Sequence, residues 1–296
     1  MKTSLQNNHI QTAMIMMTIA MLFMPIVDSI AKWMSDSIPA GQVTWGRFLF
    51  QTLLMLPFVL RLPGKLFISS VLVHIARGTT LAVATLLFFA ALKFLPIADA
   101  IAIFFVEPLL VTLLAAVFLK EKVGWRRLSA ISVGLIGAQL IIRPNFEQFG
   151  WPAALPLGAA LSFAFYILLT RSVSQREDPV AMQFYAGFFG FIFMSVALLL
   201  GDNFSVPALS AFWPTSFEWL LLFIVGLIAT VAHFLVVQSF KHAPVSVLAP
   251  FQYLEIISAT ILGLVIFGDF PDRLTWTGIT IIIASGLFVF HCERKT

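Results

Sequence analysis

Two glutamates, Glu107 and Glu255, each lie near the middle of a long apolar stretch. A charged group at the centre of a membrane-spanning helix costs about 2.5–3.5 kcal/mol on insertion scales, so such residues usually face a protein interior or a water-filled cavity. In that position a carboxyl group can bind a polar substrate or take part in proton transfer. The alternative is a buried glutamate that bonds to a neighbouring helix and fixes its packing.

Helical spacing places further polar and aromatic side chains beside these carboxylates. Phe104 shares a face with Glu107, whereas Phe251, Gln252 and Ser258 share a face with Glu255. Such a surface offers carboxylate, amide and aromatic groups to a planar, polar ligand. Three tyrosines also lie within apolar stretches, where a hydroxyl group requires a polar partner. They are Tyr166, Tyr185 and Tyr253.

Two further ionisable residues are candidates for the same site. Asp28 is followed one helical turn later by Lys32, so it either forms a salt bridge with Lys32 or recognises amine or ring N–H groups of a substrate. Arg47 lies about 10 Å into its apolar stretch. It either binds an anionic group or neutralises a carboxylate such as Asp28 or Asp99. Arg77 lies about two turns inside the end of its stretch, where a long side chain can reach the membrane surface.

These residues form the predicted substrate-binding site: Asp28, Arg47, Phe104, Glu107, Tyr166, Tyr185, Phe251, Gln252, Tyr253, Glu255 and Ser258. Glu107, Glu255 and His233 are the candidates for proton coupling, although a lone histidine in a span is more often a packing residue. Pro25 and Pro108 are expected to break or hinge their helices. The reason is that proline lacks an N–H group and its ring disturbs the bond to the carbonyl four residues earlier.

The composition indicates which elements position these side chains. Of 296 residues 60% are hydrophobic and 11% are charged, against roughly 45–50% and roughly 25% in ordinary soluble domains. The mean hydropathy is +0.98. These values exclude a soluble fold, a disordered chain and a collagen. The single cysteine, Cys292, excludes an internal disulfide.

Ten apolar stretches have the length of a membrane-spanning helix, which is about 20 residues. Turn residues or charges separate them. The sequence therefore predicts an all-α membrane protein with ten transmembrane helices. The stretches are residues 11–31, 40–60, 69–91, 96–118, 126–142, 151–170, 180–200, 217–238, 244–267 and 274–291.

The distribution of Lys and Arg predicts the orientation of these helices. Connections on the side of both termini hold twelve of the 18 basic residues and the opposite connections hold four. By the positive-inside rule, both termini are expected in the cytoplasm. The basic charge thus reflects topology, and no concentrated basic stripe indicates a nucleic-acid partner.

Glu107 and Glu255 belong to two similar segments separated by 148 positions, and Pro96 and Pro244 correspond at the same offset. Because five is an odd number, two five-helix repeats would insert in opposite orientations. Many secondary transporters use such inverted repeats to alternate access around a site near the midplane. The predicted repeats are residues 1–147 and residues 148–296.

The chain resembles the bacterial drug/metabolite transporter superfamily of the ten-helix EamA type. The resemblance covers nearly the whole sequence. It rests on the motifs Trp45-Gly46-Arg47-Phe48, Ala91-Leu92-Lys93-Phe94-Leu95-Pro96, Phe105-Val106-Glu107-Pro108 and Phe118-Leu119-Lys120-Glu121. The second repeat departs from the pattern, since Glu255-Ile256 stands where the first repeat has Glu107-Pro108, and this puts functional symmetry between the repeats in doubt.

The run from Ile103 to Arg127 is most similar to the riboflavin importers of this superfamily, and S-adenosylmethionine importers and amino-acid exporters are similar too. The resemblance implies a secondary transporter for a small organic metabolite in the inner membrane of a bacterium, with riboflavin uptake as the first expectation. S-adenosylmethionine import, or export of amino acids or drug-like metabolites, is the alternative.

No sequence motif indicates catalysis or a bound cofactor. P-loops, nucleotide-binding fingerprints, metal-ligand clusters and Ser/His/Asp arrangements are missing. A membrane-embedded enzyme, which would need convergent groups near one interface, is therefore the less favoured class. The expected partners are the small-molecule substrate and membrane lipid. Small residues on the stretches at 126–142 and 274–291 allow close helix packing within the chain or, as a minority alternative, a homodimer.

Overall fold

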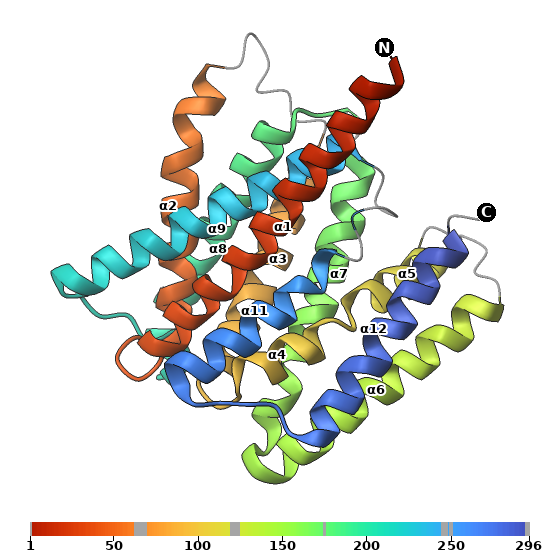
Figure 1. Cartoon of the computed structure of the whole chain (residues 1–296). Helices are drawn as coiled ribbons and strands as arrows, with labels where there is room; N and C mark the ends of the chain where they lie inside the picture. Colours follow the sequence, from red (N-terminus) through yellow and green to blue (C-terminus); the bar gives the residue numbers. More distant parts are fainter. Residues whose placement is uncertain are drawn as a thin grey trace.

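The computed structural model describes residues 2–61, 70–118, 125–173, 176–243, 248 and 251–293. Within these ranges every regular element is a helix, and the helices form one bundle (Figure 1). They are α1 (Lys2–Met34), α2 (Ala40–Leu60), α3 (Val71–Leu92), α4 (Ile97–Phe104), α5 (Glu107–Phe118), α6 (Trp125–Phe149), η1 (Trp151–Ala154), α7 (Leu155–Val173), α8 (Pro179–Asn203), η2 (Pro207–Leu209), α9 (Ser216–His242), α11 (Leu254–Leu262), η3 (Gly263–Phe267) and α12 (Arg273–Glu293).

Seven of the described segments are long and apolar enough to cross a membrane, counting α4 and α5 together as Ile97–Ala115. Three shorter apolar helices, Leu128–Ile142, Leu254–Phe267 and Arg273–Phe288, lie at three further predicted spans. The prediction of an all-helical membrane protein is confirmed for the described ranges. The count of ten spans stays a prediction.

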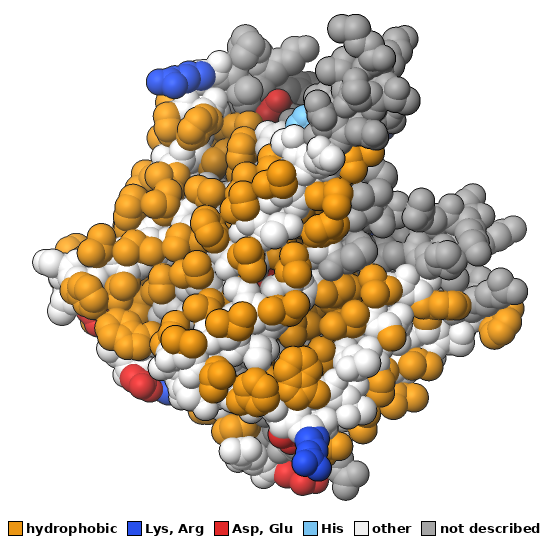
Figure 2. Space-filling model, in the orientation of Figure 1, with side chains coloured by type: hydrophobic (Ala, Val, Ile, Leu, Met, Phe, Trp, Pro, Cys, Tyr) orange, Lys and Arg blue, Asp and Glu red, His pale blue; other side chains and the backbone are white. Residues whose placement is uncertain are grey.

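The outer surface is apolar, as a lipid environment requires. Figure 2 shows hydrophobic side chains spread over one face, with most visible charged side chains near its edges. Large side chains such as Leu72, Val265 and Leu199 are at least 70% exposed. In water such a surface would aggregate, whereas in a bilayer these side chains contact acyl chains.

Helices from the first half of the sequence pack against helices from the second half. α1 lies along α9, α2 along α8 and α9, α3 along α7 and α8, and α6 along α12 (Figure 1). The two halves of the chain are thus interleaved, and any polar residue on their inner faces lies between elements distant in sequence.

The small-residue stripes expected on two helices bring α6 and α12 together. A Cβ atom at Gly137 would lie 3.1 Å from the carbonyl oxygen of Gly278, so only glycine permits this approach. A Cβ atom at Gly134 would contact Leu109 of α5 and Ser285 of α12. These stripes therefore pack against helices of the same chain.

Proline affects the helices in two different ways. α1 continues through Pro25, so the break expected there is absent. Membrane helices tolerate proline where neighbouring helices and side chains satisfy the freed backbone groups. By contrast, α4 ends at Phe104 and α5 begins at Glu107, directly before Pro108. A second interruption at Tyr253, before α11, was not expected from the sequence.

Candidate functional site: a polar cluster at the centre of the bundle

Arg47 of α2 is buried at the meeting point of three helices. Its Nη1 donates a hydrogen bond to Oγ1 of Thr85 on α3, and its Nη2 lies 3.5 Å from Nε2 of His233 on α9. Gly46 permits the close approach of α9, since a Cβ atom there would lie 2.8 Å from Cδ2 of Leu222. The guanidinium group also lies 5.0 Å from the ring centre of Phe48, a cation–π distance.

His233 is held in one tautomer by its two contacts. Its Nδ1 lies 3.0 Å from the carbonyl oxygen of Ala229, which can only accept a hydrogen bond. Nδ1 therefore carries the proton, and Nε2 is left to accept from Arg47. The geometry gives His233 a positioning role for the guanidinium group.

Two carboxylates face this group from other helices. The charge of Asp28 on α1 interacts with that of Arg47, and the charge of Glu255 on α11 interacts with that of Asp28. Ser258, one turn after Glu255, donates a hydrogen bond to the carbonyl oxygen of Leu22 and ties α11 to α1 at 3.1 Å. We call Asp28, Arg47, Thr85, His233 and Glu255 the central cluster.

Glu107 is the first residue of α5 and is not part of the central cluster. Its charge interacts with Arg171 of α7 and with the hydroxyl group of Tyr253. Glu107 and Glu255 each occupy the first turn of a helix that follows an interruption. The positive end of the helix dipole stabilises a carboxylate in that position, which explains how both are accommodated in the interior.

The two interruptions meet each other. The ring of Phe105 lies 5.3 Å from the ring of Tyr253, centre to centre. The Tyr253 hydroxyl is buried and has no hydrogen-bond partner within the part of the chain that the structure describes. Discontinuous helices near the midplane are where transporters commonly bind substrates and coupling ions.

Other predicted site residues lie away from the central cluster. Tyr185 contacts His74, with 5.1 Å between ring centres, and Tyr166 lies 5.4 Å from the Arg77 guanidinium group. Phe104 packs between Phe88 and Phe163, each at 5.5 Å. Half-buried Gln252 lies at the interruption before α11. Phe251 lines a surface groove of about 380 Å³ with Gln11, Met14, Ile15, Thr18 and Ile19.

One of the two alternatives for Asp28, its salt bridge with Lys32, does not form, and the expectation that Arg77 reaches the membrane surface is wrong. Lys32 does not pair with Asp28, because its Nζ lies 2.8 Å from Oδ2 of Asp269 and donates to the Leu95 carbonyl oxygen at 2.8 Å. Helical spacing allowed the local pair, but these acceptors come from segments distant in sequence. Arg77 does not extend to the membrane surface, because it is buried among hydrogen-bond acceptors.

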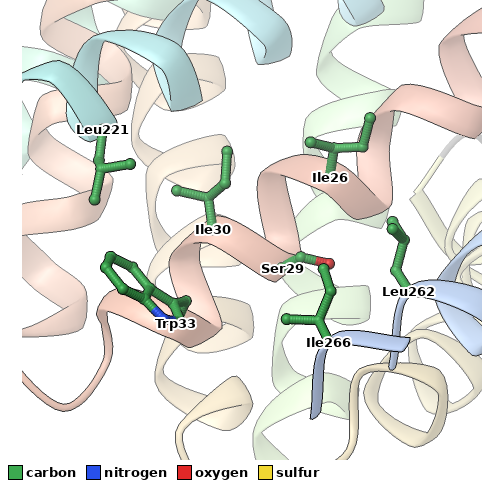
Figure 3. A pocket seen from close by; sticks show the side chains of 7 residues that line it. All are labelled: Ile26, Ser29, Ile30, Trp33, Leu221, Leu262 and Ile266. Carbon is green, nitrogen blue, oxygen red and sulfur yellow. The ribbon is translucent and has the colours of Figure 1, made fainter. Parts of the chain in front are cut away.

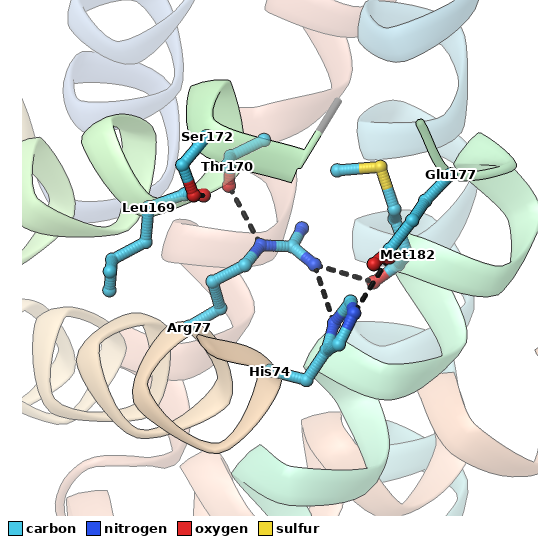
Figure 4. Close-up of polar contacts among 7 residues, drawn as sticks. All are labelled: His74, Arg77, Leu169, Thr170, Ser172, Glu177 and Met182. Carbon is cyan, nitrogen blue, oxygen red and sulfur yellow. Dashed lines mark hydrogen bonds and ion pairs between the residues drawn. The ribbon is translucent and has the colours of Figure 1, made fainter. Parts of the chain in front are cut away.

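The acceptors around Arg77 form a polar network that sequence reasoning missed (Figure 4). Arg77 donates to Thr170 Oγ1 at 3.0 Å and to His74 Nδ1 at 3.0 Å. His74 Nε2 in turn lies 2.7 Å from Glu177 Oε2, and both side chains are fully buried. The spacing of His74 and Arg77 on one helical face was the available signal, but Glu177 is too distant in sequence for any pattern to connect it.

A second groove, of about 170 Å³, opens on the apolar surface between α1, α9 and the end of α11 (Figure 3). Among the described residues that line it, Ser29 is the only polar side chain, and its hydroxyl donates to the Pro25 carbonyl oxygen at 2.7 Å. The described lining is therefore suited to an apolar molecule and not to a polar metabolite. Within the described ranges, no three His, Cys, Asp or Glu side chains are grouped as metal ligands.

Comparison with known proteins gives a consistent result. The EamA-like transporter family matches residues 11–143 and again residues 150–291. An "S-adenosylmethionine uptake transporter" of Rickettsia bellii is 32% identical and aligns over 90% of this chain and 89% of its own length. A "Riboflavin transporter" of Vibrio cholerae is 27% identical and aligns over 99% of this chain and 97% of its own length. A "Pseudopaline exporter" of Pseudomonas aeruginosa is 24% identical over 96% and 98%.

The fold also matches a solved crystal structure. The two chains superpose with a TM-score of 0.64 at 18% identity, covering 97% of this chain and 99% of the other. This likeness concerns the fold alone. The family and the names of these relatives point to transport.

Proposed function

Because the chain belongs to the EamA-like transporter family, we propose that this multi-pass membrane transporter takes up S-adenosylmethionine and binds it at the central cluster. The proposal rests on the balance between carboxylates and cations in the interior of the bundle. In the central cluster two carboxylates, those of Asp28 and Glu255, stand against one guanidinium group, that of Arg47, while the charge of Glu107 interacts with that of Arg171. An excess of carboxylates favours a substrate with net positive charge.

S-adenosylmethionine has the matching groups. Its sulfonium and ammonium groups are cations that Asp28 and Glu255 would bind, and its single carboxylate would bind Arg47 through a charge-assisted hydrogen bond. The Nε of Arg47 is buried and has no hydrogen-bond partner in the described ranges, so a donor is left for that carboxylate. The relative in Rickettsia bellii supports the same substrate.

Riboflavin uptake is the second candidate. The relative in Vibrio cholerae favours it, and so does the aromatic and amide surface of Gln252 and Tyr253 beside Glu255. Riboflavin, however, is uncharged, so it would bring no cation to the two carboxylates, Asp28 and Glu255, that share the central cluster with Arg47. The charge argument therefore ranks it below S-adenosylmethionine.

The proposed mechanism is alternating access by two five-helix repeats of opposite orientation, residues 1–147 and 148–296. Three observations support it: the family matches the chain twice, helices of the two sequence halves are interleaved, and both helix interruptions precede a glutamate. Proton coupling through Glu107, Glu255 or His233 belongs to the same proposal. Equal uptake with and without an imposed pH gradient would exclude it.

Uptake by proteoliposomes containing the purified chain tests the substrate. Radiolabelled S-adenosylmethionine is offered, with S-adenosylhomocysteine, riboflavin or an amino-acid mixture as competitors. S-adenosylhomocysteine lacks only the methyl group and the sulfonium charge, so it is the matched probe. We expect accumulation that excess S-adenosylmethionine abolishes and S-adenosylhomocysteine reduces more weakly. Uptake of riboflavin, without uptake of S-adenosylmethionine, would overturn the assignment.

A further inference from the structure

The network around Arg77 joins the two segments that match the transporter family. His74 and Arg77 lie on α3, in the first segment, while Thr170 and Glu177 belong to α7 and the connection to α8, in the second. Because a guanidinium group only donates, His74 Nδ1 accepts from Arg77, and the proton is carried by Nε2, which lies 2.7 Å from Glu177 Oε2. The positive Arg77 and the negative Glu177 are thereby balanced through one imidazole ring (Figure 4). We call these four residues the His74 network.

A second charged contact also joins the two segments. Lys32, near the end of α1, bonds to Asp269, which follows η3, with 2.8 Å between Nζ and Oδ2. The same Nζ lies 5.1 Å from the ring centre of Phe267. The two charged side chains are 16% and 31% exposed, so water reaches this pair. We call it the Lys32 bridge.

These contacts lie at opposite ends of the bundle. Lys32 donates a hydrogen bond to the Leu95 carbonyl oxygen, just beyond the last turn of α3. His74 lies in the first turn of the same helix. At 1.5 Å per residue, the intervening helix separates them by about 30 Å, the thickness of a bilayer core. Thr85 of the central cluster, which bonds to Arg47, lies on α3 between these two contacts.

We propose that the His74 network and the Lys32 bridge are the two latches of the transport cycle, each holding the two segments together at one end of the central cluster. Opening either end requires its latch to separate while the other remains closed. This inference rests on the proposed alternating-access mechanism and is independent of the substrate.

The two latches differ in how readily they open. A fully buried charge that loses its partner is strongly destabilised unless water enters. The His74 network can therefore separate only when water enters that end of the bundle. The Lys32 bridge is already partly hydrated, so it contributes less free energy to holding its end closed. The end that carries Lys32 should open more readily in the substrate-free protein.

Accessibility of a cysteine in the interior tests the latches without any substrate. The reporter is Ser258→Cys in a Cys292→Ser background, labelled by a membrane-impermeant thiol reagent in right-side-out and in inside-out vesicles. The test variants are Glu177→Gln and Asp269→Asn, each of which removes one charge and keeps the shape of the side chain. Asp178→Asn and Asp272→Asn are the matched controls, because these neighbouring carboxylates only cap α8 and α12 at 2.7 Å.

We expect Glu177→Gln to raise the labelling rate from the His74 end about tenfold, which corresponds to roughly 1.4 kcal/mol, and to lower it from the opposite end. Asp269→Asn should shift labelling in the other direction by a smaller factor. The controls should behave like the parent. A parallel rise at both ends would mean general loosening and would overturn the proposal, as would unchanged labelling. A failed uptake assay for S-adenosylmethionine leaves this readout unaffected.

Discussion

At the scale of single residues, Arg47 is the group on which the proposed site depends. Thr85 and His233 hold its guanidinium group from two helices, and neither of them carries a negative charge that would satisfy it. Asp28, on a third helix, interacts electrostatically with the Arg47 guanidinium group. A positioned cation of this kind can bind a ligand carboxylate with little cost of ordering.

Replacing Arg47 with lysine tests this role. Lysine keeps the positive charge but lacks the planar fork of donors, so it cannot hold Thr85, His233 and a ligand carboxylate together. Loss of one charge-assisted hydrogen bond costs roughly 1.5–3 kcal/mol, so we expect the KM for S-adenosylmethionine to rise about tenfold or more. Initial uptake rates over a range of concentrations measure it. Arg61→Gln, an exposed residue at the end of the same helix, is the control.

Asp28→Asn tests whether the interior selects for positive charge. The amide keeps the size of the side chain but cannot attract a sulfonium or ammonium group. We expect the preference for S-adenosylmethionine over S-adenosylhomocysteine to fall about tenfold, as roughly 1.4 kcal/mol of discrimination is lost. Competition assays with both compounds give the ratio. A purely structural Asp28 would alter both affinities equally, and exposed Asp36→Asn should alter neither.

At the scale of helices, the sequence predicted the elements much better than their contacts. Apolar length and flanking charges located the spans, and Pro108 marked the interruption before α5. The pairing of Lys32 with Asp269, and of His74 with Glu177, could not be predicted from one sequence. Helical periodicity reports neighbours within a helix, whereas these partners meet only after distant helices have packed.

The packing of α6 on α12 leads to a prediction about stability. Gly278→Val should destabilise the protein by roughly 1–3 kcal/mol, because the added side chain has no space beside Ile141 and Gly137. Thermal unfolding in detergent, followed by tryptophan fluorescence, measures the shift in Tm. Ala284→Val on the exposed side of α12 is the matched control and should leave Tm nearly unchanged. Equal shifts in the two variants would show that this helix contact contributes little.

At the scale of the whole molecule, the central cluster, the two latches and the apolar exterior form one arrangement. The His74 network and the Lys32 bridge lie between the two matched segments, while the face shown in Figure 2 is largely apolar in the part of the chain that the structure describes. Relative movement of the segments then changes polar contacts without exposing charge to lipid. The orientation of this arrangement in the membrane decides which latch faces the cytoplasm.

The positive-inside rule predicts that the His74 network faces the cytoplasm, on the side of both termini, and that the Lys32 bridge faces outward. Trp213→Cys lies in the exposed connection between α8 and α9, at the Lys32 end, and Arg176→Cys lies in the connection between α7 and α8, at the other end. In a Cys292→Ser background, an impermeant thiol reagent should label the first in intact cells and the second only in inverted membranes. An outward-facing Lys32 end, which opens more readily, would present the empty central cluster to external substrate, as uptake requires. The opposite labelling pattern would place that end in the cytoplasm and favour export.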